Sequence, residues 1–157
     1  MVKLTPRQVD ALVQLATSQV GVRHDGPNTG PMIEAYQRSA GNGPGASWCC
    51  DFIVWLLTAI VGNAIPLRRS GSCHDVLAEA QAEGRSITNP VRGAIGYLID
   101  PTTGLAHHTF LCTSSVDSNE VVKTIEGNTN DDGSTNGIGV FARTRKLDEN
   151  VEFVLLT

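Results

Sequence analysis

Apolar and polar positions divide the chain into a helical first part and a strand-rich second part. Up to Gly84, apolar residues recur every three or four positions, which is typical of helices. After Pro90 they form short runs separated by turn-forming residues, which is typical of strands. The predicted helices are Pro6–Val20, Met32–Ala40, Cys49–Val61 and Cys73–Gln81. The predicted strands are Gly93–Ile99, Ala106–Thr113, Val121–Glu126, Ile138–Arg143 and Val151–Leu156. This order predicts an α+β fold in which N-terminal helices pack on a C-terminal antiparallel β-sheet.

The predicted third helix differs from the others because nearly all of its faces are apolar. A helix of this kind lies inside a fold rather than on its surface. Asp51, Trp55 and Thr58 fall at i, i+4 and i+7 and leave one narrow polar stripe. The helix begins with two adjacent cysteines, Cys49 and Cys50, directly after a segment rich in glycine and proline. A cysteine therefore stands at the first turn of a buried helix.

The length and charge of the chain restrict its possible functions. With 157 residues, we expect one domain that spans residues 1–157. The formal net charge of −4 gives no electrostatic support for nucleic acid as a partner. No apolar run reaches the ~18 residues of a membrane-spanning helix, and no secretory signal follows Met1. We therefore expect a monomer that is made in the cytoplasm and does not insert into the membrane.

The cysteines give no indication of disulfides or of a zinc site. They are Cys49, Cys50, Cys73 and Cys112. Their spacing matches no disulfide framework, and a chain of this length folds without one, so reduced thiols are expected. No Cys-x-x-Cys or His-x-x-x-His spacing is present, and adjacent pairs are poorly suited to chelate zinc. We expect neither a metal nor another cofactor.

One segment is similar to the first half of a calcium-binding loop. Asn128, Asn130 and Asp132 alternate and are followed by Gly133. Gly139, however, stands where the bidentate glutamate of such a loop is required. The segment is better interpreted as a polar loop between two strands.

Residues on the helix and on two strands form a candidate catalytic set. A thiol attacks as the thiolate, which a helix N-terminus or a neighbouring imidazolium favours, and Cys49 has the helix N-terminus by position. His107 and His108 lie at the start of a predicted strand. A catalytic histidine is usually oriented by a third group. Glu126 and Asn128, at i and i+2, are expected to share one face beside it.

Each of these residues also has an ordinary structural interpretation. A buried cysteine is more often a small apolar residue than a nucleophile, and we expect that role for Cys73 and Cys112. The histidine pair fits a polar surface, and Glu126 fits the end of a strand that enters a turn. Their combined order, with a cysteine on a helix and a histidine and an acid on successive strands, favours a nucleophilic cysteine.

Three segments also resemble a known family. Trp48–Ile53 resembles the Trp-Cys-Ala-x-Phe-Val signature of CHAP domains, the cysteine, histidine-dependent amidohydrolases/peptidases. His108-Thr109 resembles the family's catalytic histidine at the start of a strand. Thr124–Asn130 is similar to its segment that contains an acid and an asparagine. The resemblance covers about Gly21 to Arg145.

The resemblance implies a papain-like fold and hydrolysis of amide bonds in peptidoglycan. It implies that Cys49 is the nucleophile and that His108 is first the general base and then the general acid. Glu126 would orient the histidine, and Asn128 would be a supporting polar residue. The backbone N–H of Cys49 would help to bind the oxyanion.

Two positions depart from the family pattern. Cys50 stands where the family usually has alanine, which leaves two candidate nucleophiles, and we favour Cys49 because it directly follows Trp48. Phe110 stands where glycine is common, which weakens the choice between the two histidines.

Strand alternation favours His108 over His107. His108 shares a strand face with Phe110 and Cys112, and we expect this more apolar face to pack on the helix that carries the nucleophile.

The sequence therefore predicts a peptidoglycan hydrolase like a phage or prophage endolysin, acting as an N-acetylmuramoyl-L-alanine amidase or as a peptide or cross-bridge endopeptidase. Two alternatives stay open. One is a muropeptide-binding module without catalytic activity. The other is an antibacterial toxin that cleaves a different amide and has an immunity partner. The sequence does not distinguish which amide bond is cut.

Overall fold

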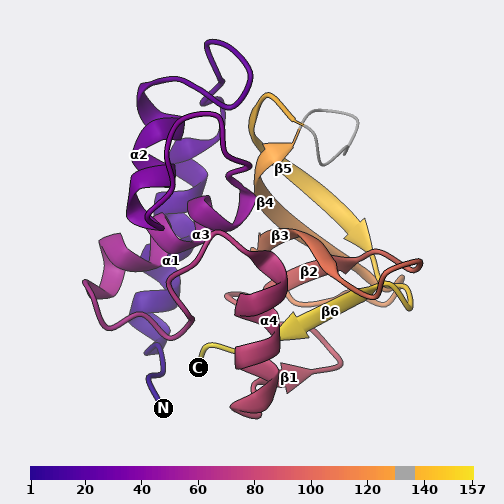
Figure 1. Ribbon diagram of the computed structural model, residues 1–157. Helices are drawn as coiled ribbons and strands as arrows, with labels where there is room; N and C mark the ends of the chain where they lie inside the picture. The colour runs from indigo at the N-terminus through magenta and orange to yellow at the C-terminus, as the bar shows by residue number, and fades with distance from the viewer. Residues whose placement is uncertain (130–136) are drawn as a thin grey trace.

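Helices and strands occupy different parts of the molecule in the computed structural model, which describes residues 1–129 and 137–157 (Figure 1). The helices are α1 (Pro6–Gln19), α2 (Pro31–Ser39), α3 (Cys49–Val61) and α4 (Cys73–Ala82). The strands are β1 (Ser86–Ile87), β2 (Ile95–Ile99), β3 (Ala106–Cys112), β4 (Val121–Thr129), β5 (Gly139–Lys146) and β6 (Val151–Val154). The predicted α+β class is confirmed. None of the helices in the described ranges has the length and apolar character needed to cross a membrane.

The strands form one antiparallel sheet in the order β1-β6-β2-β3-β4-β5. β2 to β5 are neighbours in the order in which they follow along the chain, and β6 returns to pair with β2 and with β1. The antiparallel arrangement is as predicted. The sequence does not predict β1, because its two residues leave no alternating pattern.

β4 extends beyond its predicted end at Glu126. It continues to Thr129, which pairs with Gly139 of β5, and the register shifts between Glu126 and Thr129. Asn128, within this irregular part, has a φ of 56°. The prediction that a loop begins at Asn128 is therefore wrong. The rest of the predicted loop, with the calcium-like positions Asn130, Asp132 and Gly133, lies outside the described residues.

The helix N-termini differ in how their backbone N–H groups are satisfied. At α1, the Thr5 hydroxyl accepts a hydrogen bond from the Gln8 N–H at 3.2 Å, and the Gln8 side chain accepts one from the Thr5 N–H at 2.9 Å. A threonine directly before a proline at the start of an apolar repeat predicts such a cap from the sequence, and the structure confirms it. At α4, Ser72 accepts from the Asp75 N–H. Among the described residues, no side chain caps α3, which follows Trp48. The first turn of α3 therefore keeps N–H groups for another acceptor.

The sheet has an apolar cluster on each of its faces. Leu111 and its partner Ile125 belong to the large core that includes the helices. Phe110 and Cys112 point the other way, into a smaller cluster with Val122. The expectation that the face of Phe110 and Cys112 packs on the helix of the nucleophile is therefore wrong. The larger apolar core instead includes Leu111, on the other face of β3, together with residues of the helices.

Candidate active site

The first residue of α3, Cys49, lies where the helices meet the sheet. Trp48, directly before it, is fully buried and stacks on Tyr36 with ring centroids 5.6 Å apart. On the sheet side, a Cβ atom added at Gly127 would lie 2.8 Å from the Cβ atom of Phe52, closer than side chains normally approach. Glycine at this position therefore allows β4 to rest directly on α3.

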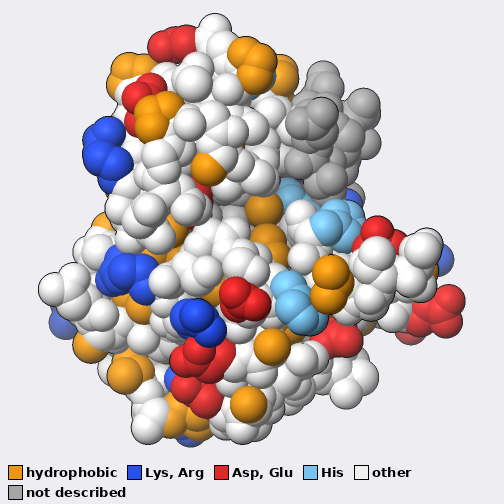
Figure 2. Space-filling model, viewed as in Figure 1, with side chains coloured by type: hydrophobic (Ala, Val, Ile, Leu, Met, Phe, Trp, Pro, Cys, Tyr) orange, Lys and Arg blue, Asp and Glu red, His pale blue; other side chains and the backbone are white. Residues whose placement is uncertain are grey.

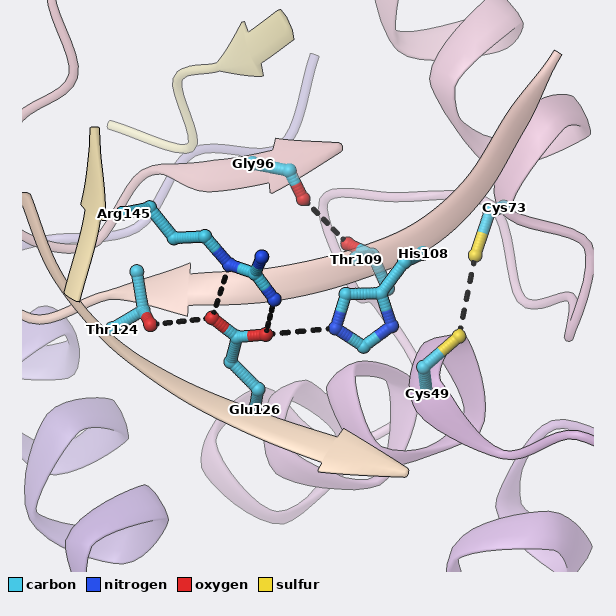
Figure 3. Close-up of polar contacts among 8 residues, drawn as sticks. All are labelled: Cys49, Cys73, Gly96, His108, Thr109, Thr124, Glu126 and Arg145. Atoms are coloured by element: carbon cyan, nitrogen blue, oxygen red, sulfur yellow. Dashed lines mark hydrogen bonds and ion pairs between the residues drawn. The ribbon is translucent and has the colours of Figure 1, made fainter. Parts of the chain in front are cut away.

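His108 lies between Cys49 and Glu126 (Figure 3). Its Nε2 atom is 2.8 Å from Glu126 Oε1, and both side chains are fully buried. The edge of the ring that carries Nδ1 is turned toward the Cys49 sulfur. Because a carboxylate accepts a hydrogen bond, Nε2 carries the hydrogen in the neutral ring, and Nδ1 faces the thiol as a base.

Glu126 is a buried carboxylate held by several donors. Arg145 donates from Nε to Oε2 at 2.9 Å and from Nη2 to Oε1 at 2.5 Å. The Thr124 hydroxyl donates to Oε2 at 2.6 Å. Burial raises the pKa of Glu126, but the hydrogen bonds with His108 and Arg145 outweigh burial and lower this pKa to about 2. Glu126 is therefore ionised near neutral pH.

Arg145 is a site residue that the sequence analysis missed. It lies on β5 opposite Val122 of β4, and its guanidinium also lies over the Phe110 ring, 5.5 Å from the centroid. Arg145 lies beyond the predicted end of its strand at Arg143, and a single arginine there gives no signal of its own. The register of β4 with β5 was needed to show that Arg145 and Glu126 share one face.

Cys49 and His108 influence each other's ionisation. Burial lowers the pKa of His108, but its interactions with Cys49 and Glu126 outweigh burial and raise this pKa to about 8. The pKa of the Cys49 thiol is raised well above its ordinary value by the hydrogen bond with Cys73 and by burial, while His108 opposes the rise. Cys49 is thus a neutral thiol at rest. His108 must release a proton before its neutral imidazole can accept the proton of that thiol, so the two groups titrate as a pair.

Asn128 contacts a different part of the molecule from Glu126. Its Nδ2 atom donates to Ser47 Oγ at 3.0 Å and connects the end of β4 to the segment before α3. The register shift and the positive φ of Asn128 interrupt the alternation that would place it beside Glu126. The structure thus brings Glu126, but not Asn128, to His108 by a hydrogen bond. The supporting role of Asn128 stays a prediction.

The other cysteines and the second histidine have separate environments. The Cys50 thiol donates to the Ser70 carbonyl at 3.2 Å, and His107 is exposed. Cys112 lies in the smaller apolar cluster, as its predicted packing role requires. Cys73 is also packed in the core, but its sulfur lies 3.6 Å from that of Cys49. Within residues 1–129 and 137–157, no group of three or more His, Cys, Asp or Glu side chains is placed to hold a metal ion.

The surface near the site is hollowed. Figure 2 shows a depression where the helical part meets the sheet, with pale blue histidine side chains at its rim. Figure 1, in the same view, places the beginning of α3 and the strands β3 and β4 in this region. The candidate nucleophile is almost covered, with 4% of Cys49 exposed. A molecule that reaches this sulfur must therefore enter a narrow space.

Comparisons with known proteins do not assign the chain to a family. No protein-family model matches it, and no curated protein matches it either. The geometry of the site and the local resemblance to CHAP domains are therefore the two indications of function.

Proposed function

We propose that the chain is a cysteine-dependent hydrolase that cleaves an amide bond of bacterial peptidoglycan. The observation that carries the proposal is the buried series of Cys49, His108 and Glu126, with Glu126 fixed by Arg145. Buried charges are costly, and apolar residues of similar size serve a purely structural core at least as well. Perturbed titratable groups beside a thiol at a helix start are typical of catalytic sites.

The first half of the proposed reaction forms an acyl-enzyme. His108 takes the thiol proton through Nδ1, and Cys49 Sγ attacks the carbonyl carbon of the scissile amide. Uncapped N–H groups of the first turn of α3, including that of Cys49, stabilise the oxyanion. The imidazolium then gives its proton to the leaving nitrogen, the C–N bond breaks, and a thioester remains on Cys49.

The second half returns the enzyme to its resting state. His108 takes a proton from a water molecule that attacks the thioester, and the carboxylic acid product leaves as the thiol is restored. Glu126 stabilises the imidazolium in both halves and keeps Nε2 as its hydrogen-bonded nitrogen. Arg145 and Thr124 act indirectly by holding the Glu126 carboxylate in one orientation.

The choice of peptidoglycan as substrate depends on the resemblance to CHAP domains. Trp48–Ile53 and Thr124–Asn130 carry this resemblance, and they contain the nucleophile and the acid of the geometric site. Cleavage occurs either between the glycan and the stem peptide or within the peptide part. The two outcomes leave different new termini, because the first frees the lactyl carboxylate of muramic acid and the second leaves that linkage intact.

Digestion of purified peptidoglycan tests this function. We expect the wild-type chain to release new amino groups, whereas Cys49→Ala lowers the rate by about 10³-fold or more because the nucleophile is absent. Cys50→Ala is the matched control, since its thiol bonds to the Ser70 carbonyl, and it should keep most of the activity. Mass spectrometry of the products identifies the bond.

Two results would contradict the proposal. Full activity of Cys49→Ala would show that another group is the nucleophile. Tight binding of muropeptides by the wild-type chain without any new terminus would instead favour a recognition module. Thermal unfolding of both variants shows whether loss of activity reflects loss of the fold.

A further inference from the structure

Two thiols from different helices meet beside the candidate nucleophile. Cys49 is the first residue of α3 and Cys73 is the first residue of α4. Their sulfur atoms lie 3.6 Å apart, and both residues are free cysteines (Figure 3). They are separated by 24 positions in the sequence, so packing of the helices, and not chain continuity, brings them together.

We propose that Cys49 and Cys73 form a reversible oxidation site that closes to an intramolecular disulfide in the presence of a peroxide. The bond removes the thiol of Cys49 and restores it on reduction by a dithiol. The formation of the bond does not depend on the proposed function. Its consequence, reversible loss of hydrolytic activity, does rest on that function.

The geometry favours this pair over the other thiols. A disulfide bond is about 2.05 Å long, so the two sulfur atoms must approach by about 1.5 Å from van der Waals contact. The Cys50 thiol donates to the Ser70 carbonyl, but Cys50 also interacts with Cys73 and raises its pKa, so it is the competing thiol that the variants below must exclude. Cys112 lies in the smaller apolar cluster, which does not include Cys73.

The position of His108 decides which sulfur reacts first. The ring faces Cys49, so Cys49 has a base beside it that can accept its proton. Cys73 lies on the other side of Cys49, as Figure 3 shows, and is placed as the second thiol. This arrangement of a reactive thiol and a resolving thiol is the one that gives a sulfenic acid a short lifetime.

The reaction balances with a peroxide as the oxidant. The Cys49 thiolate attacks one oxygen of hydrogen peroxide, an S–O bond forms, the O–O bond breaks, and hydroxide leaves to become water after protonation. The Cys73 thiolate then attacks the sulfenic sulfur, an S–S bond forms, the S–O bond breaks, and a second water is released. The two thiols together lose two electrons and two protons, and the peroxide is reduced to two water molecules.

Peptide mapping of the intact folded chain tests the site. The protein is treated with hydrogen peroxide, its free thiols are blocked with N-ethylmaleimide, and it is digested with trypsin. Cleavage after Arg38, Arg68, Arg69 and Arg85 separates the peptide of Cys49 and Cys50 from that of Cys73. We expect these two peptides to be linked, with one maleimide on the first of them, and dithiothreitol to separate them.

Four variants identify the thiols that form the link. Cys50→Ala and Cys112→Ala should form the disulfide as the wild type does. Cys73→Ala should form no link and should instead accumulate a sulfenic acid on Cys49 that reacts with dimedone. A link that persists in Cys49→Ala, or one that disappears in Cys50→Ala, would overturn the assignment, as would the absence of any link while Cys49 is oxidised.

Activity measurements separate this inference from the proposed function. If the chain cleaves peptidoglycan, the rate should fall in proportion to the fraction of protein with the disulfide and should recover with dithiothreitol. A disulfide in a chain without hydrolytic activity would support the oxidation site and contradict the function. Hydrolysis with no detectable disulfide would support the function and contradict the oxidation site.

Discussion

Two carboxyl groups in the same core, Glu126 on β4 and Asp51 on α3, are equally buried but have opposite pKa shifts. Burial raises the pKa of both. At Glu126 hydrogen bonds outweigh it and the pKa is lowered to about 2, whereas at Asp51 burial dominates and the pKa is raised to about 7. Asp51 accepts one hydrogen bond, from Asn42 Nδ2 at 2.8 Å, and its Oδ2 atom has no partner among the described residues.

The difference between these regions shows that depth alone does not determine charge. Glu126 faces an imidazole and a bidentate guanidinium on one face of the sheet, so its ionised form is well paired. Asp51 faces a neutral amide and the closely packed Gly71. The first environment suits a group that must stay charged beside a catalytic imidazole. The second holds a carboxyl group that changes its charge near neutral pH.

The largest expected effect comes from Glu126→Gln. Without the carboxylate, His108 loses a partner that raises its pKa, and the imidazolium formed in the reaction is less stable. We expect hydrolytic activity to fall by about 10²–10⁴-fold. The rate at which iodoacetamide alkylates Cys49, measured against pH, should have its acid limb near pH 8 in the wild type and at lower pH in the variant.

The exposed residue Glu149 offers a matched control for this substitution. Glu149→Gln removes the same charge at the surface and should leave both the activity and the alkylation profile unchanged. An alkylation profile that is identical in Glu126→Gln and the wild type would show that Glu126 does not act on the imidazole.

The second effect concerns stability and comes from Arg145→Met. This substitution leaves the buried Glu126 charge without its bidentate partner, so we expect the free energy of unfolding to fall by about 3–5 kcal/mol in chemical denaturation. The stability of Arg145→Lys should lie between those of the wild type and Arg145→Met. Lysine keeps the positive charge, but its ammonium group cannot make the paired contact. Arg92→Met is the control: Arg92 pairs with Asp10 at the surface, where such a pair contributes about 0–1 kcal/mol. Equal losses in Arg145→Met and Arg92→Met would contradict the comparison.

The third effect is a dependence of stability on pH that comes from Asp51. Between its unfolded pKa of 3.8 and its folded pKa of about 7, the folded state holds a proton that the unfolded chain has released. The contribution of Asp51 to stability therefore falls as the pH rises through this window. Asp51→Asn does not titrate, so we expect its stability relative to the wild type to improve from pH 4 to pH 8 by about 3–4 kcal/mol.

Denaturation of both proteins across this pH range measures the difference. Glu149→Gln removes an exposed carboxylate and serves as the control for loss of charge alone. A constant difference between Asp51→Asn and the wild type at all pH values would mean that Asp51 does not titrate in this window.

The fold class was predictable from the sequence because periodicity is a local property. Every helix begins within one residue of its predicted start, and the capping residue Thr5 is visible without the structure. The extension of β4 was not predictable, since pairing with β5 and a bulge at Asn128 decide it. Polar residues such as Asn128 and Thr129 indicate a loop until their partners are known.

The candidate site was predictable only in part, for a related reason. Cys49, His108 and Glu126 follow from motif strings, and the structure places His108 between the other two. Arg145 and Cys73 reach the site through sheet register and helix packing, which no local pattern carries. The choice of His108 agrees with its buried position beside Cys49, but the reasoning from an apolar face did not hold, since Phe110 and Cys112 pack in a cluster that contains no residue of the described helices.

The close contact at Gly127 also affects how the site moves. Its neighbours in the chain are Glu126, which bonds to His108, and Asn128, which bonds to Ser47 just before α3. Because the main chain between them rests on Phe52, the carboxylate of Glu126 and the amide of Asn128 are both held against α3, the helix that begins with Cys49. Thermal displacement of that helix should carry the strand with it, so that the sulfur, the imidazole and the carboxylate fluctuate as one body.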